Sequence, residues 1–91
     1  MEWKIEKNHI SLLNEKQQIV AYVTFPEVGA NTVDIAHTVV SPALRGQGIA
    51  GKLMEKLTEV LRADGRKAVL SCAYAVRWFN EHPENADVLA K

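Results

Sequence analysis

The sequence predicts an α+β fold in which helices pack on a mainly antiparallel sheet, in the order β-β-β-α-β-α. Three observations predict it. Segments rich in valine, threonine and aromatic residues fill the first half of the chain and are separated by short polar turns. In the second half, apolar residues recur at the three- and four-residue spacing of one helical face. The length of 91 residues suits one domain, so we expect residues 1–91 to form a single domain.

Three strands are expected before the long helix. Residues 10–13 form a short apolar stretch, and residues 19–25 are rich in residue types that fit a half-buried pleated surface. Residues 32–40 alternate, which favours a third strand with one face made of Val33, Ile35, His37 and Val39. Short turns join the three segments, so we expect an antiparallel meander.

The long helix is expected to end at Asp64-Gly65, where the glycine suits a left-handed cap. Residues 67–72 are expected to form a short strand and residues 73–82 a second helix, stopped by Pro83. A crossover through a helix implies parallel pairing somewhere in the sheet. The apolar face of the long helix consists of Ile49, Ala50, Leu53, Met54, Leu57, Val60 and Leu61.

Charge and cysteine content argue against several classes of function. The 11 basic and 11 acidic residues cancel, so there is no electrostatic reason to expect nucleic acid or an anionic membrane as a partner. A single cysteine, Cys72, allows no intrachain disulfide and no multi-cysteine zinc site, and we expect no metal site of another kind. The N-terminal residues lack a signal-peptide pattern and no apolar run is long enough to span a membrane, so we expect a cytoplasmic protein.

The segment with the strongest chemical pattern is residues 45–52, R-G-Q-G-I-A-G-K, at the start of the long helix. Glycines let backbone N–H groups approach a ligand without an intervening Cβ. The unpaired amides and the positive dipole end of the helix favour an anion there, especially a phosphate. The sequence therefore predicts an anion-binding turn at this helix start.

Two nucleotide-binding motifs match this segment only in part. Gly46, Gly48 and Gly51 fit the G-x-G-x-x-G dinucleotide fingerprint, but no carboxylate ends the following strand to hold a ribose. A chain of 91 residues is also too short for two mononucleotide-binding halves. A P-loop needs Ser or Thr at the position of Leu53, to hold magnesium. Both interpretations are therefore rejected.

The pattern [QR]-x-x-G-x-[GA], here R-G-Q-G-I-A, follows an apolar strand and opens an amphipathic helix. In this context it resembles the acetyl-CoA-binding motif of the GCN5-related N-acetyltransferases, over about residues 19–79. The resemblance implies an N-acetyltransferase fold with a cofactor cleft where two strands splay. It implies acetyl-CoA as cosubstrate and an amine of a small molecule or protein as acceptor. The cofactor-binding residues it implies are Val39, Val40, Arg45, Gly46, Gln47, Gly48, Ile49, Ala50 and Gly51.

The chain is similar in particular to the very small members of that family, which recurrently carry a strand histidine and a strand-end cysteine. Here these are His37 and Cys72, which the resemblance marks as catalytic candidates that face one another across the cleft. His37 could accept the amine proton; a half-buried structural histidine is the alternative. Cys72 could be an acetyl-enzyme nucleophile, a lining residue of the pantetheine channel, or a packing residue.

Three further residues lie on the second expected helix. Tyr74 could serve as the general acid toward the thiolate, as a tyrosine does in many family members, although packing is the simpler role. Arg77 and Asn80 could touch the cofactor or be exposed to solvent. For the whole chain, the alternative to an N-acetyltransferase is a CoA-binding module without efficient catalysis.

Overall fold

The computed structural model describes residues 1–90. In this range the chain forms strands, two α-helices and two short 3-10 helices. Their bounds in chain order are β1 (Glu2–Glu6), β2 (His9–Leu13), β3 (Ile19–Thr24), β4 (Glu27–Gly29), β5 (Thr32–Ile35), β6 (His37–Val40), η1 (Pro42–Leu44), α1 (Ile49–Asp64), β7 (Lys67–Leu70), α2 (Ala73–Glu81) and η2 (Pro83–Val88).

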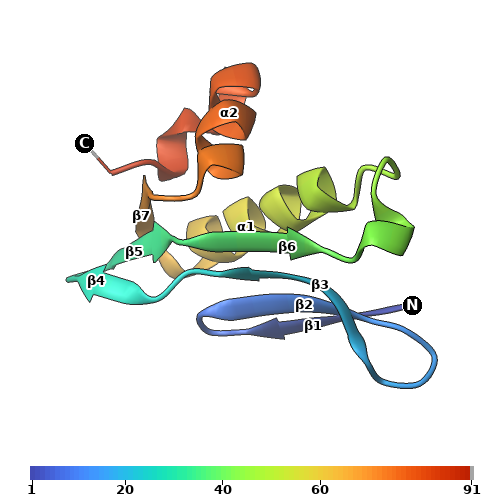
Figure 1. The fold of residues 1–91 in the computed structure, drawn as a ribbon. Helices are drawn as coiled ribbons and strands as arrows, with labels where there is room; N and C mark the ends of the chain where they lie inside the picture. The colour runs from blue at the N-terminus through green and yellow to red at the C-terminus, as the bar shows by residue number, and fades with distance from the viewer. Residues whose placement is uncertain (91) are drawn as a thin grey trace.

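The strands form two sheets, and the chain passes from one sheet to the other between β5 and β6. One sheet has the order β1-β2-β3-β6 and is antiparallel throughout. The other has the order β4-β5-β7, with β7 parallel to β5. The helix α1 contacts β2, β3 and β6, while α2 contacts α1 and β7 (Figure 1). The predicted α+β class with a mainly antiparallel sheet is confirmed, as is the parallel pair.

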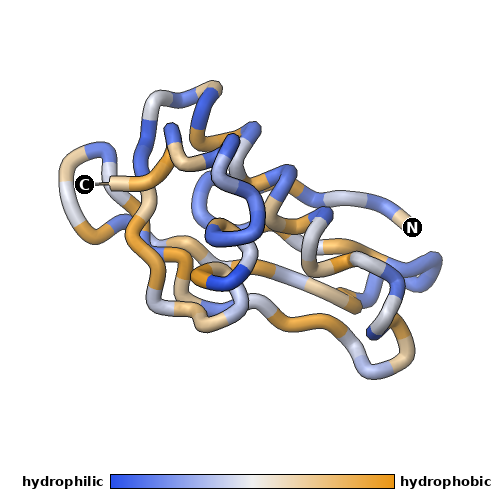
Figure 2. Tube along the Cα trace, turned by 90° about the horizontal axis from the view of Figure 1, so that it is seen from above, coloured by the Kyte–Doolittle hydropathy of each residue, from blue (hydrophilic) through white to orange (hydrophobic). Residues whose placement is uncertain are grey.

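One hydrophobic cluster joins both sheets to both helices. Hydrophobic and hydrophilic residues are mixed along the whole trace (Figure 2). Strand β3 buries every second residue, and α1 buries one face. Gly65 ends α1 in the left-handed conformation with φ 74°, as the sequence predicts. The buried residues that α1 contributes are Ile49, Leu53, Met54, Leu57, Thr58 and Leu61.

The structure adds elements that the sequence pattern did not predict. Strand β1 pairs along its full length with β2, and the short β4 pairs with β5. Beyond Pro83, η2 leads to Leu89, which forms a parallel bridge to Ala68 of β7. This C-terminal segment is fastened to α1 because Arg62 donates two hydrogen bonds of 2.8 Å to the carboxylate of Asp87.

The expectation of one uninterrupted strand over residues 32–40 is wrong, because the strand breaks at Ala36 into β5 and β6. Ile35 is fully buried, whereas His37, two residues later, is exposed. Regular alternation would place both on one face, so the break shifts the alternation by one residue. After the break Thr38 and Val40 lie on the α1 side of the sheet, and His37 and Val39 lie on the opposite side.

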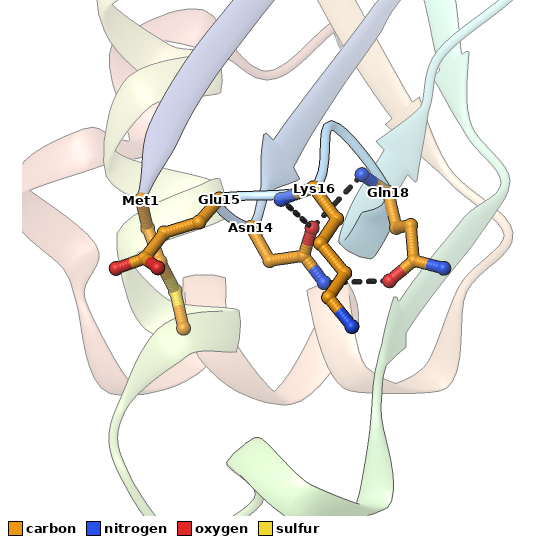
Figure 3. A pocket seen from close by; sticks show the side chains of 5 residues that line it. All are labelled: Met1, Asn14, Glu15, Lys16 and Gln18. Carbon is orange, nitrogen blue, oxygen red and sulfur yellow. Dashed lines mark hydrogen bonds between the residues drawn. The ribbon is translucent and has the colours of Figure 1, made fainter.

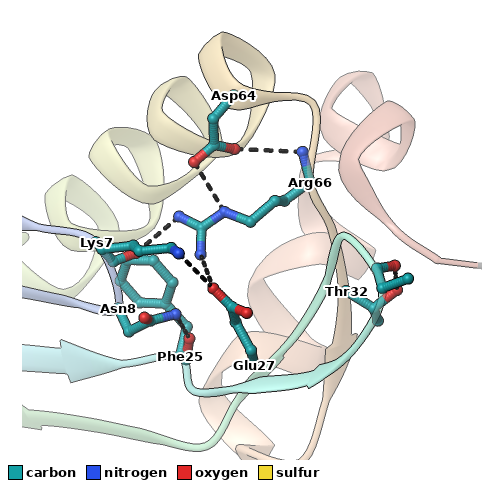
Figure 4. A network of polar contacts seen from close by, with 8 residues as sticks. Lys7, Asn8, Phe25, Glu27, Thr32, Asp64 and Arg66 are labelled. Carbon is teal, nitrogen blue, oxygen red and sulfur yellow. Dashed lines mark hydrogen bonds and ion pairs between the residues drawn. The ribbon is translucent and has the colours of Figure 1, made fainter.

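A buried arginine holds together the end of the molecule away from the glycine-rich turn (Figure 4). Arg66 is 6% exposed and donates to Asp64 Oδ2 at 2.8 Å and to the Lys7 carbonyl at 2.7 Å. Its guanidinium also stacks over the Phe25 ring, 5.6 Å from the centroid, and lies 3.9 Å from Glu27. The network thus ties the end of α1 to the β1–β2 turn and to β4.

Within residues 1–90, neither α1 nor α2 has the length and apolar character needed to cross a bilayer.

Candidate functional site

A groove of about 450 Å³ lies where β6, the glycine-rich turn and the two α-helices meet. The end of β6 and η1 form one side, the first turn of α1 forms the floor, and α2 forms the other side. The residues that line it are Val40, Leu44, Arg45, Gly46, Gly48, Ala50, Gly51, Tyr74 and Arg77. The sequence motif and the cavity therefore coincide.

The glycine-rich turn has the geometry of an anion site. Gly46 and Gly48 have positive φ angles of 84° and 75°, which favour glycine over any other residue. A Cβ added to either would meet no heavy atom within 4 Å, so both face open space. Gly48 is the N-cap of α1, and the amide of Lys52 bonds back to its carbonyl at 3.2 Å. The amides between Gly48 and Lys52 precede the first helical hydrogen bond and remain available to a ligand.

Two arginines add positive charge to the groove. Arg45 Nε donates to the Val40 carbonyl at 3.4 Å, and the Arg77 guanidinium lies 5.4 Å from the Tyr74 ring centroid. Burial raises the pKa of the Tyr74 hydroxyl above its ordinary value, and the charge of Arg77 offsets this only in part. Tyr74 is therefore a protonated donor at neutral pH. With the dipole of α1, the arginines favour a ligand with more than one negative charge.

Gly51 faces α2 from the first turn of α1. A Cβ built on Gly51 would lie 3.7 Å from Trp78 Nε1 and 3.8 Å from the Tyr74 hydroxyl, which are ordinary contact distances. Unlike Gly46 and Gly48, Gly51 therefore faces packed side chains, and the Tyr74 that it faces also lines the groove.

Cys72 lies between the end of β7 and the start of α2, at the point where the chain turns away from its partner strand β5. The amides of Ser71 and Cys72 both bond to the Ile35 carbonyl, at 3.1 and 3.0 Å, and there the pairing of β5 and β7 ends. Cys72 Sγ is hydrogen bonded to Thr38 Oγ1 at 3.5 Å. The residue is half-buried and stands at the N-cap of α2.

The pKa of the Cys72 thiol lies below its ordinary value. Burial alone raises it, but the Thr38 hydroxyl and backbone N–H groups, including those of Ala75 and Tyr74, together outweigh burial. These groups favour the thiolate, and a helix start has the same effect. A larger fraction of Cys72 is therefore thiolate at neutral pH than of an isolated cysteine.

The expectation that His37 and Cys72 face one another is wrong. Thr38 is the β6 residue that contacts Cys72. His37 is the cross-strand partner of Thr24 and points to the side of the sheet away from α1. The cause is the break at Ala36, which turns the following side chains over. The two candidates lie on opposite sides of the sheet at the point where β6 and β7 part.

The structure brings most of the sequence-predicted cofactor residues to the groove, namely Val40, Arg45, Gly46, Gly48, Ala50 and Gly51. Ile49 is buried in the core, Val39 is exposed on the opposite face, and Gln47 is exposed. Only the backbone atoms of Ile49 and Gln47 remain candidates for contact with the cofactor, because Val39 is paired with Tyr22 of β3. Sequence reasoning missed Leu44 and Thr38. Thr38 lies on the same side of β6 as Val40, but only the structure places it against Cys72.

A second hollow, of about 330 Å³, lies beside the β2–β3 turn (Figure 3). Asn14, which lines this hollow, is used within the turn: Asn14 Oδ1 accepts hydrogen bonds from the amides of Lys16 and Gln18 at 2.9 and 3.0 Å. Asn14 also donates to the Gln18 side chain at 2.9 Å. Among residues 1–90, no group of three or more His, Cys, Asp or Glu side chains could hold a metal ion. The groove at the glycine-rich turn is therefore the stronger candidate site.

Comparison with known proteins assigns this geometry to a family. The family model described as GCN5-related N-acetyl-transferase matches residues 9–88. The chain belongs to the GCN5-related N-acetyltransferase family. Acetyl-CoA is the usual cosubstrate of this family. The recognition based on the R-G-Q-G-I-A motif is thus confirmed.

Three relatives show how far the similarity extends. Protein NATD1 of Xenopus tropicalis is 36% identical over 63 residues, which make up 69% of this chain and 58% of that protein. The chain therefore matches less than two thirds of that relative's length. The NMR structure of a GCN5-like protein from Staphylococcus aureus has a TM-score of 0.80 at 29% identity and covers 98% of this chain and 87% of that one. The crystal structure of the GNAT family N-acetyltransferase YhbS from Escherichia coli, solved in complex with CoA, has a TM-score of 0.63 at 25% identity and covers 68% and 38% of the two chains.

Proposed function

We propose that the chain is an acetyl-CoA-dependent N-acetyltransferase that moves an acetyl group to an amine of a small molecule or protein. The observation that carries this proposal is the groove at the N-terminus of α1, where free amides, two positive-φ glycines and two arginines converge. The CoA complex of the Escherichia coli relative supports the choice of cofactor. One hydrophobic cluster supports the groove from both sheets, in agreement with a single minimal domain over residues 1–91.

The residues present fit the chemistry of acetyl-CoA. The amides of Gly46 to Gly51 would hold the pyrophosphate, and Arg45 and Arg77 would balance its charge. Strand β6 pairs with β3 on one edge only. Its other edge, at Val40, leaves a backbone N–H group available to the pantetheine arm or the thioester carbonyl. Acetyl-CoA supplies the activated acetyl group; the chain supplies position and proton transfer.

Three side chains are proposed to handle protons or the acetyl group. Tyr74 lines the groove and stays protonated, so it can donate a proton to the departing thiolate. His37 lies on the other side of the sheet, where an amine that enters between β6 and β7 would lose its proton. Cys72, with its lowered pKa, lies at the same opening and is proposed either to line it or to accept the acetyl group.

The test of the function is turnover of acetyl-CoA against a panel of amines, polyamines and peptide N-termini, with mass spectrometry after a brief acetyl-CoA pulse. Direct transfer gives turnover without an acetylated protein, and His37→Ala then shifts the acidic limb of the pH–rate profile. A cysteine route instead adds one acetyl group that Cys72→Ala abolishes. We expect the direct route. Failure of acetyl-CoA to bind or turn over with any acceptor class would contradict the proposal.

A CoA-binding module without efficient catalysis is the second candidate. One observation favours it: His37 and Cys72 do not contact one another, and the thiol bonds to Thr38 instead. This candidate predicts binding of acetyl-CoA without turnover for any acceptor in the panel. The same assay therefore separates the two functions.

The reactivity of Cys72 gives a prediction that does not depend on the acceptor. Because the folded protein lowers the thiol pKa, the rate of alkylation by iodoacetamide should rise with pH through a midpoint below that of the urea-unfolded chain. Thr38→Val removes the hydroxyl that favours the thiolate and should move the midpoint upward. Equal midpoints for the folded protein, the variant and the unfolded chain would show that the thiol is not activated.

A further inference from the structure

Strand β1 forms one edge of the four-stranded sheet, and within residues 1–90 the only strand that pairs with it is β2 (Figure 1). This pairing runs along the whole of β1 without a bulge, so the other edge of β1 presents a regular row of backbone groups. The opposite edge of the sheet is β6, which borders the groove. The free edge of β1 therefore lies across the sheet from the candidate site, and the function proposed above does not use it.

The backbone groups of Trp3 and Ile5 face this free edge. Hydrogen bonds alternate between the two sides along an antiparallel strand. The Phe25 amide donates to the Asn8 carbonyl at 3.0 Å, so the even-numbered residues of β2 are those that bond to β3. The odd-numbered residues of β2 then bond to β1, where the register gives them even-numbered partners. The N–H and C=O groups of Trp3 and Ile5 therefore point away from β2 and have no strand partner.

Side chains along β1 and the residue before it alternate between apolar and charged. Trp3 packs against the core on the α1 side of the sheet, and Ile5 lies on the same side but is 53% exposed. Met1 is 70% exposed. The helix α1 packs chiefly on β2, β3 and β6, so it leaves these apolar side chains uncovered at the edge. On the other side of β1, Glu2 and Lys4 are exposed.

We propose that the free edge of β1 pairs antiparallel with β1 of a second copy of this chain, about a two-fold axis at Trp3. Trp3 then lies opposite the partner's Trp3, and their free N–H and C=O groups bond to one another. Glu2 lies opposite the partner's Lys4, and Met1 lies opposite the partner's Ile5. Each of these pairs occurs twice because of the symmetry. Opposite charges and apolar residues that face one another across strands stabilise the pairing, so the segment is complementary to its own antiparallel copy.

The other registers that use the same backbone groups fit less well. An axis at Lys4 sets each lysine opposite its own copy, which is unfavourable. An axis at Ile5 also opposes unlike charges, but it places Trp3 opposite the partner's Lys7. The carbonyl of Lys7 already accepts a hydrogen bond from Arg66 at 2.7 Å. The axis at Trp3 is therefore the one that pairs both the charged and the apolar residues.

Two paired edge strands make a small interface, below the ~1,200 Å² at which standard protein interfaces begin. We therefore expect a dimer that dissociates on dilution. Because β1 and β6 are opposite edges of the sheet, the pairing joins the two sheets into one and leaves a groove at each outer edge. Pairing does not need the cofactor, so its test is separate from the test of the proposed function.

The test is sedimentation equilibrium of the chain without acetyl-CoA, over a series of concentrations, with circular dichroism to verify that each variant is folded. Glu2→Lys places lysine opposite lysine twice and should weaken the dimer about tenfold. The double variant Glu2→Lys/Lys4→Glu exchanges the charges and should restore the affinity. Glu6→Lys is the matched control: it makes the same change on the same side of β1, at a residue that has no partner in this register, and should leave the affinity unchanged.

Disulfide formation tests the position of the axis, in a Cys72→Ser background that removes the native thiol. Residues opposite one another in a hydrogen-bonded antiparallel pair have Cα atoms about 5.5 Å apart, which suits a disulfide. Trp3→Cys should therefore give a disulfide-linked dimer on oxidation, and Ile5→Cys, which lies opposite the partner's Met1, should not. A monomer at every soluble concentration, a dimer that Glu2→Lys leaves unchanged, or preferred linkage through Ile5→Cys overturns the inference.

Discussion

We expect Gly48→Val to weaken acetyl-CoA binding by about a hundredfold. The added side chain would project into the groove, where a Cβ on this residue meets open space in the absence of ligand. It would hold the pyrophosphate away from the helix-start amides. Losing two hydrogen bonds to a charged group, at about 1.5 kcal/mol each, corresponds to roughly a hundredfold in Kd. The measurement is a calorimetric titration of the folded variant with acetyl-CoA.

A matched control is available within the same helix. Gly65, at the C-terminal end of α1, has φ 74° and ψ 15°, and Gly48 at the N-terminal end has φ 75° and ψ 15°. Neither would bring a Cβ within 4 Å of another atom. Gly65→Val therefore reproduces the backbone strain at a distance from the groove and should leave Kd unchanged. Equal affinities for the two variants would mean that the glycine-rich turn does not bind the cofactor.

The second large effect concerns stability. Arg66→Ala should lower the free energy of unfolding by about 3 kcal/mol, the low end of the range for removing one partner of a buried ion pair. The low end applies because Asp64 and Glu27 keep contact with water once the arginine is gone. The loss includes hydrogen bonds to Asp64 and the Lys7 carbonyl and the contact with Phe25. Urea unfolding followed by circular dichroism measures it.

The control for Arg66 is Arg62→Ala. Arg62 donates two hydrogen bonds to Asp87 and one to Asn85, but it is exposed. If burial decides the cost, Arg62→Ala should destabilise much less despite its greater number of side-chain hydrogen bonds. Arg66→Met, which fills the buried space without a charge, should recover part of the loss. An equal cost for the two alanine variants would contradict the assigned role of Arg66.

The elements with a repeating pattern could be predicted from the sequence. The apolar spacing from Ile49 to Leu61 defined α1, and Gly65 defined its end. Strand β1 could not be predicted in this way, because Glu2, Lys4 and Glu6 make its sequence polar and its strand conformation depends on tertiary contacts, chiefly pairing with β2. The three-residue β4 likewise depends on a tertiary partner, β5.

The phosphate-binding turn was predictable because its chemistry is local. Glycines, the helix start and Arg45 are consecutive in the chain, so the motif contains the geometry. The relation between His37 and Cys72 is not local: it depends on which way a strand side chain points. A break of one residue at Ala36 reverses that direction, and nothing in the alternating pattern of residues 32–40 reveals the break. The pairing of Cys72 with Thr38 therefore required the structure.

Binding of the cofactor at the glycine-rich turn is tested by an NMR titration of the ¹⁵N-labelled chain with acetyl-CoA. We expect the amide resonances of Gly46 to Gly51 to shift most, followed by those of Val39, Val40 and Arg77 around the groove. Amides of the Arg66 network at the far end of α1 should not move. Saturable binding that shifts other regions and leaves the amides of Gly46 to Gly51 unchanged would show that this turn does not bind the cofactor.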